Sequence, residues 1–236
     1  MIIKKSDLKV VANGHILEVY NFENGCYSGF ESQGGRRGKG DDKSERENEN
    51  RTKSSRSARN RVRRQVLANF NEHSKFITLT FKDNVTDVQI ANKEFKKFIQ
   101  RMRRRYSSFK YLAVIEFQER GAVHYHMMSD LPYIPNKQLN EIWRNGFVRI
   151  NDIKHVDNVG AYMVKYMLKD VNDDRLKGNK AYLSSRGLDK EKVFRGEEAK
   201  RIIELYGLEG KEKVFTNSYE SEHHGQINYS EYNLKR

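Results

Sequence analysis

Two histidines and a glutamate form the first group of residues whose spacing could do chemistry. His124 and His126 flank Tyr125 in a segment that reads as a β-strand, so both imidazoles should point to the same face. Glu116 lies in the preceding strand, and a turn centred on Arg120 would place it directly across from His124. One carboxylate and two imidazoles make a three-ligand metal site with open positions. The ligand set suits Mg²⁺ or Mn²⁺ acting on a phosphate, with Zn²⁺ less favoured.

A second group lies on a predicted helix over residues 157–168. Tyr162 and Tyr166 are four residues apart and share one helix face, flanked by Lys165 and Lys169. Such aromatic pairs more often pack a helix than react. Here, however, three apolar residues already provide a core stripe, which leaves the tyrosines at its edge: Val159, Met163 and Met167. A phenol is a poor nucleophile when neutral, but a nearby cation or a metal-polarised phosphate makes its attack feasible. The four residues are therefore candidate catalytic groups.

The elements that must position these groups follow from hydrophobic periodicity. Short runs rich in β-branched and aromatic residues predict strands, and apolar residues at helical spacing predict helices. The strands are expected at 76–81, 111–117, 122–128 and 146–150, and the helices at 86–106, 135–144 and 157–168. The order β-α-β-β-α-β-α with a hairpin predicts an α+β fold: an antiparallel or mixed sheet with helices packed on one face, close to the split βαβ pattern.

The regions outside this core differ in composition. Residues 1–30 are expected to hold a hairpin with its turn at Asn13-Gly14. Residues 31–57 contain no hydrophobic side chain and are expected to form a disordered basic linker. The main domain is placed at 58–195 and opens with a basic helix whose apolar residues share one face: Val62, Val66, Leu67 and Phe70. Residues 196–236 are expected to form a helix followed by a polar tail.

The charge balance indicates a polyanionic partner. The chain has 45 Lys and Arg against 32 Asp and Glu, a net charge of +13. The outer face of the 86–106 helix and the 51–64 arm are expected to contact the DNA backbone. The candidate DNA-binding residues on that helix are Lys97, Arg101, Arg104 and Arg105. A single cysteine, with no signal peptide and no membrane-length apolar run, predicts a cytoplasmic protein without disulfides or membrane partners.

Taken together, these segments resemble the HUH replication initiators of small phages and rolling-circle plasmids. The strand at 76–81 looks like the family's first motif, 116–126 like its metal-ligand motif and 162–169 like its nucleophile helix. Trp143-Arg144-Asn145-Gly146-Phe147-Val148 also resembles an intervening W-x-x-G-F-V stretch. The resemblance spans about residues 58–195. One departure is Tyr125, where an aliphatic residue or Phe is commoner between the two histidines.

The resemblance implies a nicking reaction. Metal at Glu116, His124 and His126 would polarise a phosphate of single-stranded or hairpin origin DNA. Tyr162 or Tyr166 would then become linked to the 5′ side, releasing a 3′-OH. The two-tyrosine type implies alternating nucleophiles, and Lys165 or Lys169 would neutralise the phosphate. The sequence contains no P-loop, so unwinding and synthesis would need a host helicase and polymerase.

Three alternatives remain open on sequence alone. An HUH transposase or relaxase would use the same site for a different process. A non-catalytic nucleic-acid-binding regulator would share the charge and the sheet but would not need the three metal ligands to converge. A zinc hydrolase would leave both tyrosines unexplained. The segment 180–188 resembles one that follows the nucleophile helix in related initiators, and no role follows from its residues.

Overall fold

The computed structural model describes residues 4–28, 43–168, 174–176 and 178–236. The chain divides into two compact units. The central unit comprises residues 42–189, and the terminal unit comprises residues 1–41 and 190–236. The central unit has a net charge of +12 (30 basic and 18 acidic residues) and the terminal unit +1 (15 and 14), which together make the +13 of the whole chain. The excess charge is therefore a property of the central unit.

The central unit is an α+β structure around one antiparallel sheet, as the sequence predicts. Its strands are β3 (Lys75–Phe81), β4 (Tyr111–Phe117), β5 (Val123–Ser129), β6 (Gly146–Asp152) and β7 (Tyr182–Ser184), in the spatial order β6-β3-β5-β4-β7. Its helices are α1 (Lys43–Asn69), α2 (Val88–Arg105), α3 (Asn136–Trp143) and α4 (Val159–Leu168), with a 3₁₀ turn η1 at Asp174–Leu176. The hairpin β4–β5 lies at the centre of the functional argument.

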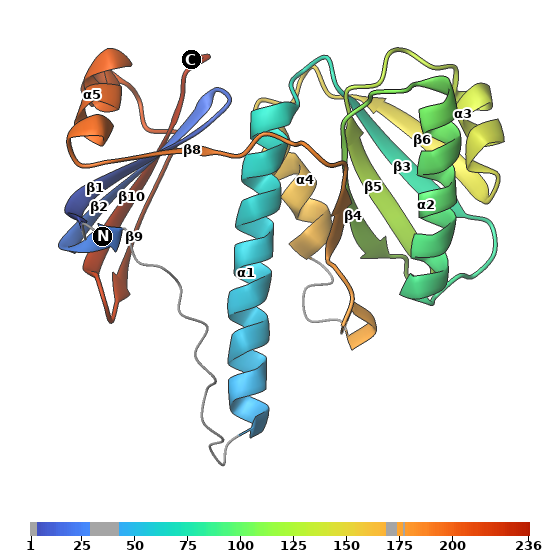
Figure 1. The fold of residues 1–236 in the computed structure, drawn as a ribbon, viewed down its shortest axis with the longest axis horizontal. Helices are drawn as coiled ribbons and strands as arrows, with labels where there is room; N and C mark the ends of the chain where they lie inside the picture. Colours follow the sequence, from blue (N-terminus) through green and yellow to red (C-terminus); the bar gives the residue numbers. More distant parts are fainter. Residues whose placement is uncertain (1–3, 29–42, 169–173, 177) are drawn as a thin grey trace. The chain divides into compact units, whose positions relative to one another are not determined.

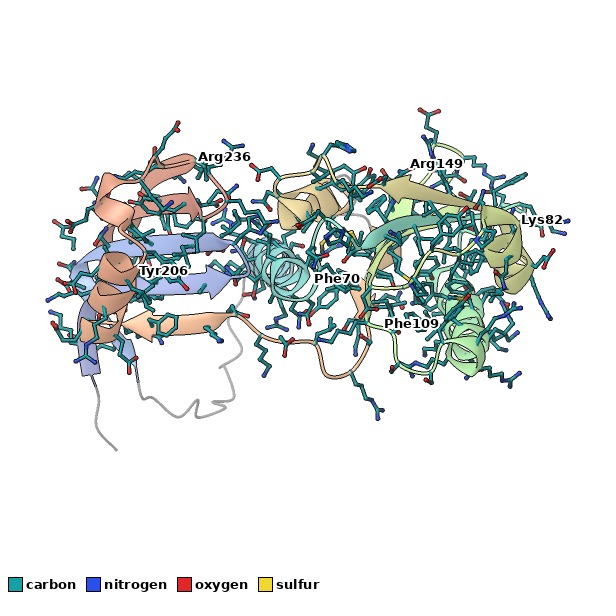
Figure 2. The ribbon with its side chains drawn as sticks, turned by 90° about the horizontal axis from the view of Figure 1, so that it is seen from above. Phe70, Lys82, Phe109, Arg149, Tyr206 and Arg236 are labelled. Carbon is teal, nitrogen blue, oxygen red and sulfur yellow. The ribbon has the colours of Figure 1, made fainter. Side chains whose placement is uncertain are left out.

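One face of this sheet is covered by α2 and α3 (Figure 1). Alternate residues of each strand point to these helices, and the apolar stripe of α2 meets them. Asp87 caps α2 by accepting hydrogen bonds from the backbone N–H groups of Gln89 and Ile90. Side chains fill the space between the sheet and α2 (Figure 2). This face therefore holds the main hydrophobic core.

The opposite face carries α4, which contacts β4 and β5, and α1, which packs on α4 (Figure 1). The apolar face of α1 is buried as predicted: Val62, Val66, Leu67 and Phe70. The helices thus lie on both faces of the sheet, with α2 and α3 on the side that the split βαβ pattern anticipates. Gly160 is the point of closest approach, because a Cβ added there would lie 2.5 Å from the backbone oxygen of Arg63.

The helix α1 corrects the expectation of a disordered linker at 31–57. Its backbone is helical from Lys43 onward, so that only residues 29–42 of this region lie outside the described residues. Lys, Glu, Arg and Ala are good helix formers, and the segment contains no proline. Once residues 62–70 are anchored by burial, each further residue adds one hydrogen bond to an existing helix. The absence of hydrophobic side chains therefore does not prevent helix formation here.

The terminal unit joins the two ends of the chain in a second antiparallel sheet. Its strands are β1 (Lys4–Asn13), β2 (Ile16–Ser28), β8 (Lys192–Arg195), β9 (Phe215–Ser221) and β10 (Gly225–Asn233), in the order β8-β1-β2-β10-β9. Helix α5 (Glu197–Leu205) and the 3₁₀ turn η2 (Leu208–Gly210) complete it. The polar tail expected from Thr216 is instead the hairpin β9–β10, because β10 pairs along β2 and buries Ile227 and Tyr232.

The predicted N-terminal hairpin is present, but its turn is shifted by one residue. Asn13 pairs with Ile16, so the turn is made by Gly14 and His15 rather than by Asn13 and Gly14. The Asn13 side chain is buried and donates a hydrogen bond to Glu18 Oε1 at 3.0 Å. Among the described residues, no helix is both long and apolar enough to cross a membrane.

The close contact at Gly160 leads to a stability prediction. We expect Gly160→Ala to lower the free energy of unfolding by about 1–3 kcal/mol, because the added methyl group must push α4 away from α1. Urea denaturation would measure this change. The matched control is Gly210→Ala, where an added Cβ meets nothing within 4 Å. Equal effects of the two substitutions would contradict the packing argument.

Candidate metal and tyrosine site

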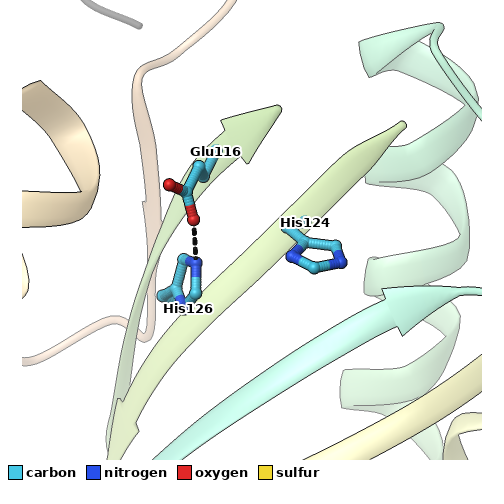
Figure 3. A group of neighbouring side chains, drawn as sticks. All are labelled: Glu116, His124 and His126. Carbon is cyan, nitrogen blue, oxygen red and sulfur yellow. Dashed lines mark hydrogen bonds and ion pairs between the residues drawn. The ribbon is translucent and has the colours of Figure 1, made fainter. Parts of the chain in front are cut away.

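The metal-ligand candidates converge as the hairpin register predicts. Glu116 of β4 pairs directly with His124 of β5, and His126 lies two residues further on the same face. Figure 3 shows the three side chains on these neighbouring strands. One ligand atom from each residue lies within 4.8 Å of the others. The turn between the strands, residues 118–122, is short enough to leave no other register for these pairs.

His126 is held from both sides of its ring. Its Nε2 lies 2.5 Å from Glu116 Oε2, and its Nδ1 lies 3.3 Å from Thr78 Oγ1 on β3. His126 and Glu116 are both buried. Without metal, one proton is shared between Nε2 and the carboxylate. With a cation in place of that proton, the Thr78 hydroxyl can accept from Nδ1–H and keep Nε2 available as a ligand.

His124 supplies an observation that tests whether this site fits a metal. Its Nε2 is buried and has no hydrogen-bond partner among the described residues. Burial, and then the nearby His126, lower the pKa of His124 to about 4, so that its ring is neutral at pH 7. A buried imidazole nitrogen without a partner carries an energetic cost that a metal bond would remove. The donor set and the unpartnered nitrogen therefore fit a divalent cation.

The two tyrosines lie beside these ligands. The Tyr166 ring stacks on the His126 ring, with centroids 3.9 Å apart and an interplanar angle of 28°. The Tyr166 hydroxyl donates a hydrogen bond to the Tyr162 hydroxyl at 3.2 Å. The Phe76 ring packs against both tyrosines, with centroids 5.0 Å from Tyr162 and 5.2 Å from Tyr166. The pair is therefore part of the site rather than only helix packing.

The environment of Tyr166 keeps its phenol protonated. Burial, and then the hydrogen bond with Tyr162, raise the pKa of Tyr166, and the Arg149 side chain opposes this rise. Helix α4 presents the tyrosines because Asn158 caps it, accepting a hydrogen bond from the Ala161 N–H at 2.8 Å. Ionisation of Tyr166 would thus need a compensating positive charge close to its oxygen.

Of the two lysines expected beside the tyrosines, one can be placed. Lys165 is exposed, and its Nζ lies 5.8 Å from the centre of the Tyr162 ring. Lys169 lies outside the described residues. Arg149 on β6 was not singled out from the sequence, although it occupies the same face of the sheet as Thr78 and His126. The alternation of strand residues from Gly146 onward is the signal that could have identified it.

The proposed DNA-binding residues of α2 are not brought to this site. Helix α2 covers the face of the sheet opposite to the metal ligands. Arg101 has a different role, because its guanidinium donates hydrogen bonds to the backbone oxygens of Ile142 (2.7 Å) and Trp143 (3.0 Å) at the end of α3. Lys97 forms an ion pair with Glu94 at 2.7 Å, and Arg104 and Arg105 are exposed.

An exposed aromatic ring on the site face was also missed by the sequence analysis as a functional candidate. Phe147 of β6 pairs with Thr80, which pairs with His124, so that Phe147 lies in one cross-strand row with the ligands. Its side chain is 70% exposed. The sequence indicated only that Phe147 belongs to a recurring stretch. A large apolar ring left in solvent beside a polar cluster is a platform on which an unpaired base can stack.

The comparisons with known proteins identify one family. Residues 74–171 match the family model of the replication-associated protein ORF2. No curated protein and no solved structure gives a significant match to this chain. The matched region contains β3, α2, the hairpin β4–β5, α3, β6 and α4, and thus every metal-ligand and tyrosine candidate. The match supports a replication-associated protein.

The low pKa of His124 predicts a pH-dependent stability. The unfolded chain binds a proton on this residue below about pH 6.5, whereas the folded chain does so only near pH 4. The contribution to stability is therefore full above pH 6.5 and is lost as the pH falls towards 4. We expect a loss of about 1–3 kcal/mol, allowing for partial solvent screening.

Urea denaturation in EDTA at pH 7.0 and pH 4.5 would measure this loss. The variant His124→Asn should lose less stability than the wild type over the same interval. The control variant His155→Asn removes an exposed histidine and should follow the wild type. The prediction fails if His124→Asn and the wild type show the same pH dependence.

Proposed function

We propose that this protein initiates replication by nicking and rejoining single-stranded DNA at an origin through a tyrosine of α4. The observation that carries the proposal is the stacking of Tyr166 on His126, which joins a nucleophile candidate to a metal-ligand cluster. Neither group has an evident structural need for the other. The match of residues 74–171 to a replication-associated family supports the choice of reaction.

Glu116, His124 and His126 would hold a divalent cation, Mg²⁺ or Mn²⁺ in preference to Zn²⁺. When bound there, the cation would supply Lewis-acid polarisation of the scissile phosphate. Thr78 orients His126 through Nδ1, and Glu116 provides the negative charge that retains a cation among two neutral imidazoles. These contacts between protein groups exist before any substrate binds.

In the proposed reaction the Tyr166 hydroxyl oxygen attacks phosphorus. The bond from Tyr166 Oη to phosphorus forms, the bond from phosphorus to the DNA 3′ oxygen breaks, and the phenolic proton leaves so that a 3′-OH is released. The DNA 5′ side stays on the tyrosine, and the reverse reaction rejoins the strand. Tyr162 and Tyr166 can address the same phosphate in turn because their hydroxyls are 3.2 Å apart. Lys165 would neutralise phosphate charge beside Tyr162, and Lys169 is proposed from its sequence position alone.

The proposed substrate is single-stranded or hairpin origin DNA. The +12 charge of the central unit favours a polyanion at the unit that contains the site. Lys97, Arg104 and Arg105 would contact the DNA backbone only where it passes the opposite side of the sheet. A host helicase and polymerase would complete replication in the cytoplasm.

Two alternatives are less well supported. A transposase or relaxase of the same chemistry would have the same site, and the replication-associated family match favours initiation over both. A regulator that only binds nucleic acid would not require Glu116, His124 and His126 within 4.8 Å of one another.

The nucleophile assignment makes a direct prediction. Incubation with labelled single-stranded DNA and Mn²⁺ should give a protease-sensitive protein–DNA adduct on a denaturing gel. Tyr162→Phe/Tyr166→Phe should abolish the adduct because both phenolic oxygens are removed. Tyr166→Phe alone should reduce it more than Tyr162→Phe, since Tyr166 contacts His126. Tyr133→Phe, at an 83% exposed tyrosine, is the control. An adduct that persists in the double variant would rule out the mechanism.

The orientation of His126 generates a separate prediction for metal binding. Thr78→Val should weaken Mn²⁺ binding by about 10–100-fold, because Nδ1 loses the group that orients the ring. Isothermal titration of the DNA-free protein would measure this. The control is Thr80→Val, the next threonine on the same face of β3. Equal Mn²⁺ affinities in the two variants would contradict the role assigned to Thr78.

A further inference from the structure

A groove of about 1220 Å³ lies within the central unit, at the β7 edge of the sheet. One wall comes from the N-terminal half of α1, and the other from residues 178–186, which include β7. The two segments that form it are the basic arm at 51–64 and the stretch at 180–188. The proposed nicking reaction assigns a definite role to neither segment. The groove is thus a feature of the fold that the tyrosine site does not explain.

The charge of the groove has one sign among the described residues that line it. Five cationic side chains contribute to the lining: Arg51, Arg61, Lys96, Lys180 and Arg186. No carboxylate side chain is among the described lining residues. The other polar groups there are serine hydroxyls and asparagine amides, which can donate hydrogen bonds to phosphate oxygens. Such a lining is complementary to a chain of phosphates.

The register of the sheet places this groove close to the metal ligands. Tyr182 of β7 pairs with Val114 of β4, and Val114 pairs with His126 of β5. Tyr182 therefore lies in the same cross-strand row as His126, two strands away, which is about 10 Å at the usual strand spacing. Tyr182 lines the groove and is only partly buried. A nucleic-acid strand leaving the site along this row would reach the groove directly.

We propose that this groove binds the single-stranded DNA next to the scissile phosphate, with the five cations on its phosphates and Tyr182 against a base. The inference rests on the proposed nicking function, because that reaction defines which strand is present. An unpaired strand can present both phosphates and base faces to one groove, whereas a duplex keeps its bases stacked inside. Four of the five cations and Tyr182 lie outside residues 74–171, so the groove is formed largely by segments beyond the family match.

The test measures DNA binding separately from cleavage. Fluorescence anisotropy with a labelled single-stranded oligonucleotide in EDTA, over a salt series, gives the dissociation constant and its salt dependence. The variant Lys180→Gln/Arg186→Gln removes two cations from one wall. We expect a salt slope smaller by about 1.4 and binding about 25-fold weaker at 0.1 M salt, from the counterions that two phosphate contacts release. The control Lys192→Gln/Lys213→Gln removes two exposed lysines from the terminal unit and should bind like the wild type.

A variant of the opposite wall keeps the proposal testable if the first pair of substitutions harms folding. Arg61→Gln changes an exposed residue of α1 and should reduce the salt slope by about 0.7. Tyr182→Phe should bind like the wild type, and Tyr182→Leu more weakly, because only the phenyl ring stacks on a base. Unchanged binding in a correctly folded Arg61→Gln and in Tyr182→Leu would overturn the proposal. Equal weakening with a duplex of the same sequence would overturn the assignment to a single strand.

The adduct assay separates this proposal from the proposed function. Weaker binding in the groove variants supports the groove whether or not the wild-type protein forms a Mn²⁺-dependent adduct. Normal binding in those variants together with a wild-type adduct refutes the groove and leaves the nicking function standing. Normal binding and no adduct refute both.

Discussion

The structure depends on the register of three antiparallel strands, β3, β5 and β4. That register sets Thr78 against His126 and His124 against Glu116, so that the three metal ligands and the group that orients one of them meet on one face. A slip of a single residue would turn the histidines towards α2 and carry Tyr125 to the opposite face. The short β4–β5 turn and the buried core residues of both strands hold this register.

The two faces of the sheet divide support from chemistry. Tyr125, between the two histidines, points to the core, where its ring stacks on Phe95 at 4.6 Å and its hydroxyl donates to Asn92 Oδ1 at 2.8 Å. An aromatic residue at this position therefore anchors β5 from behind while His124 and His126 face the site. Arg101 belongs to the same supporting side, where its guanidinium binds the last carbonyl groups of α3.

Helix α4 connects the sheet chemistry to the rest of the central unit. One side of α4 presents Tyr162 and Tyr166 to Phe76 and His126, and the other packs on α1. Gly160 permits the close crossing, since any larger residue would meet the α1 backbone. The position of the tyrosine hydroxyls relative to the ligands is consequently sensitive to α1, a helix whose sequence lies outside the matched family region.

The sequence by itself determined the features that depend on local geometry. Strand alternation places His124 and His126 on one face, the short turn pairs Glu116 with His124, and the helical repeat aligns Tyr162 with Tyr166. Only the tertiary structure decided which sheet face receives α4, that Tyr166 lies on His126, that Arg101 caps α3, and that the two chain ends share a sheet. These outcomes depend on contacts between residues far apart in the chain, which neither periodicity nor composition encodes. The helix at 43–57 belongs with them, because its weak local signal acts only once residues 62–70 are packed.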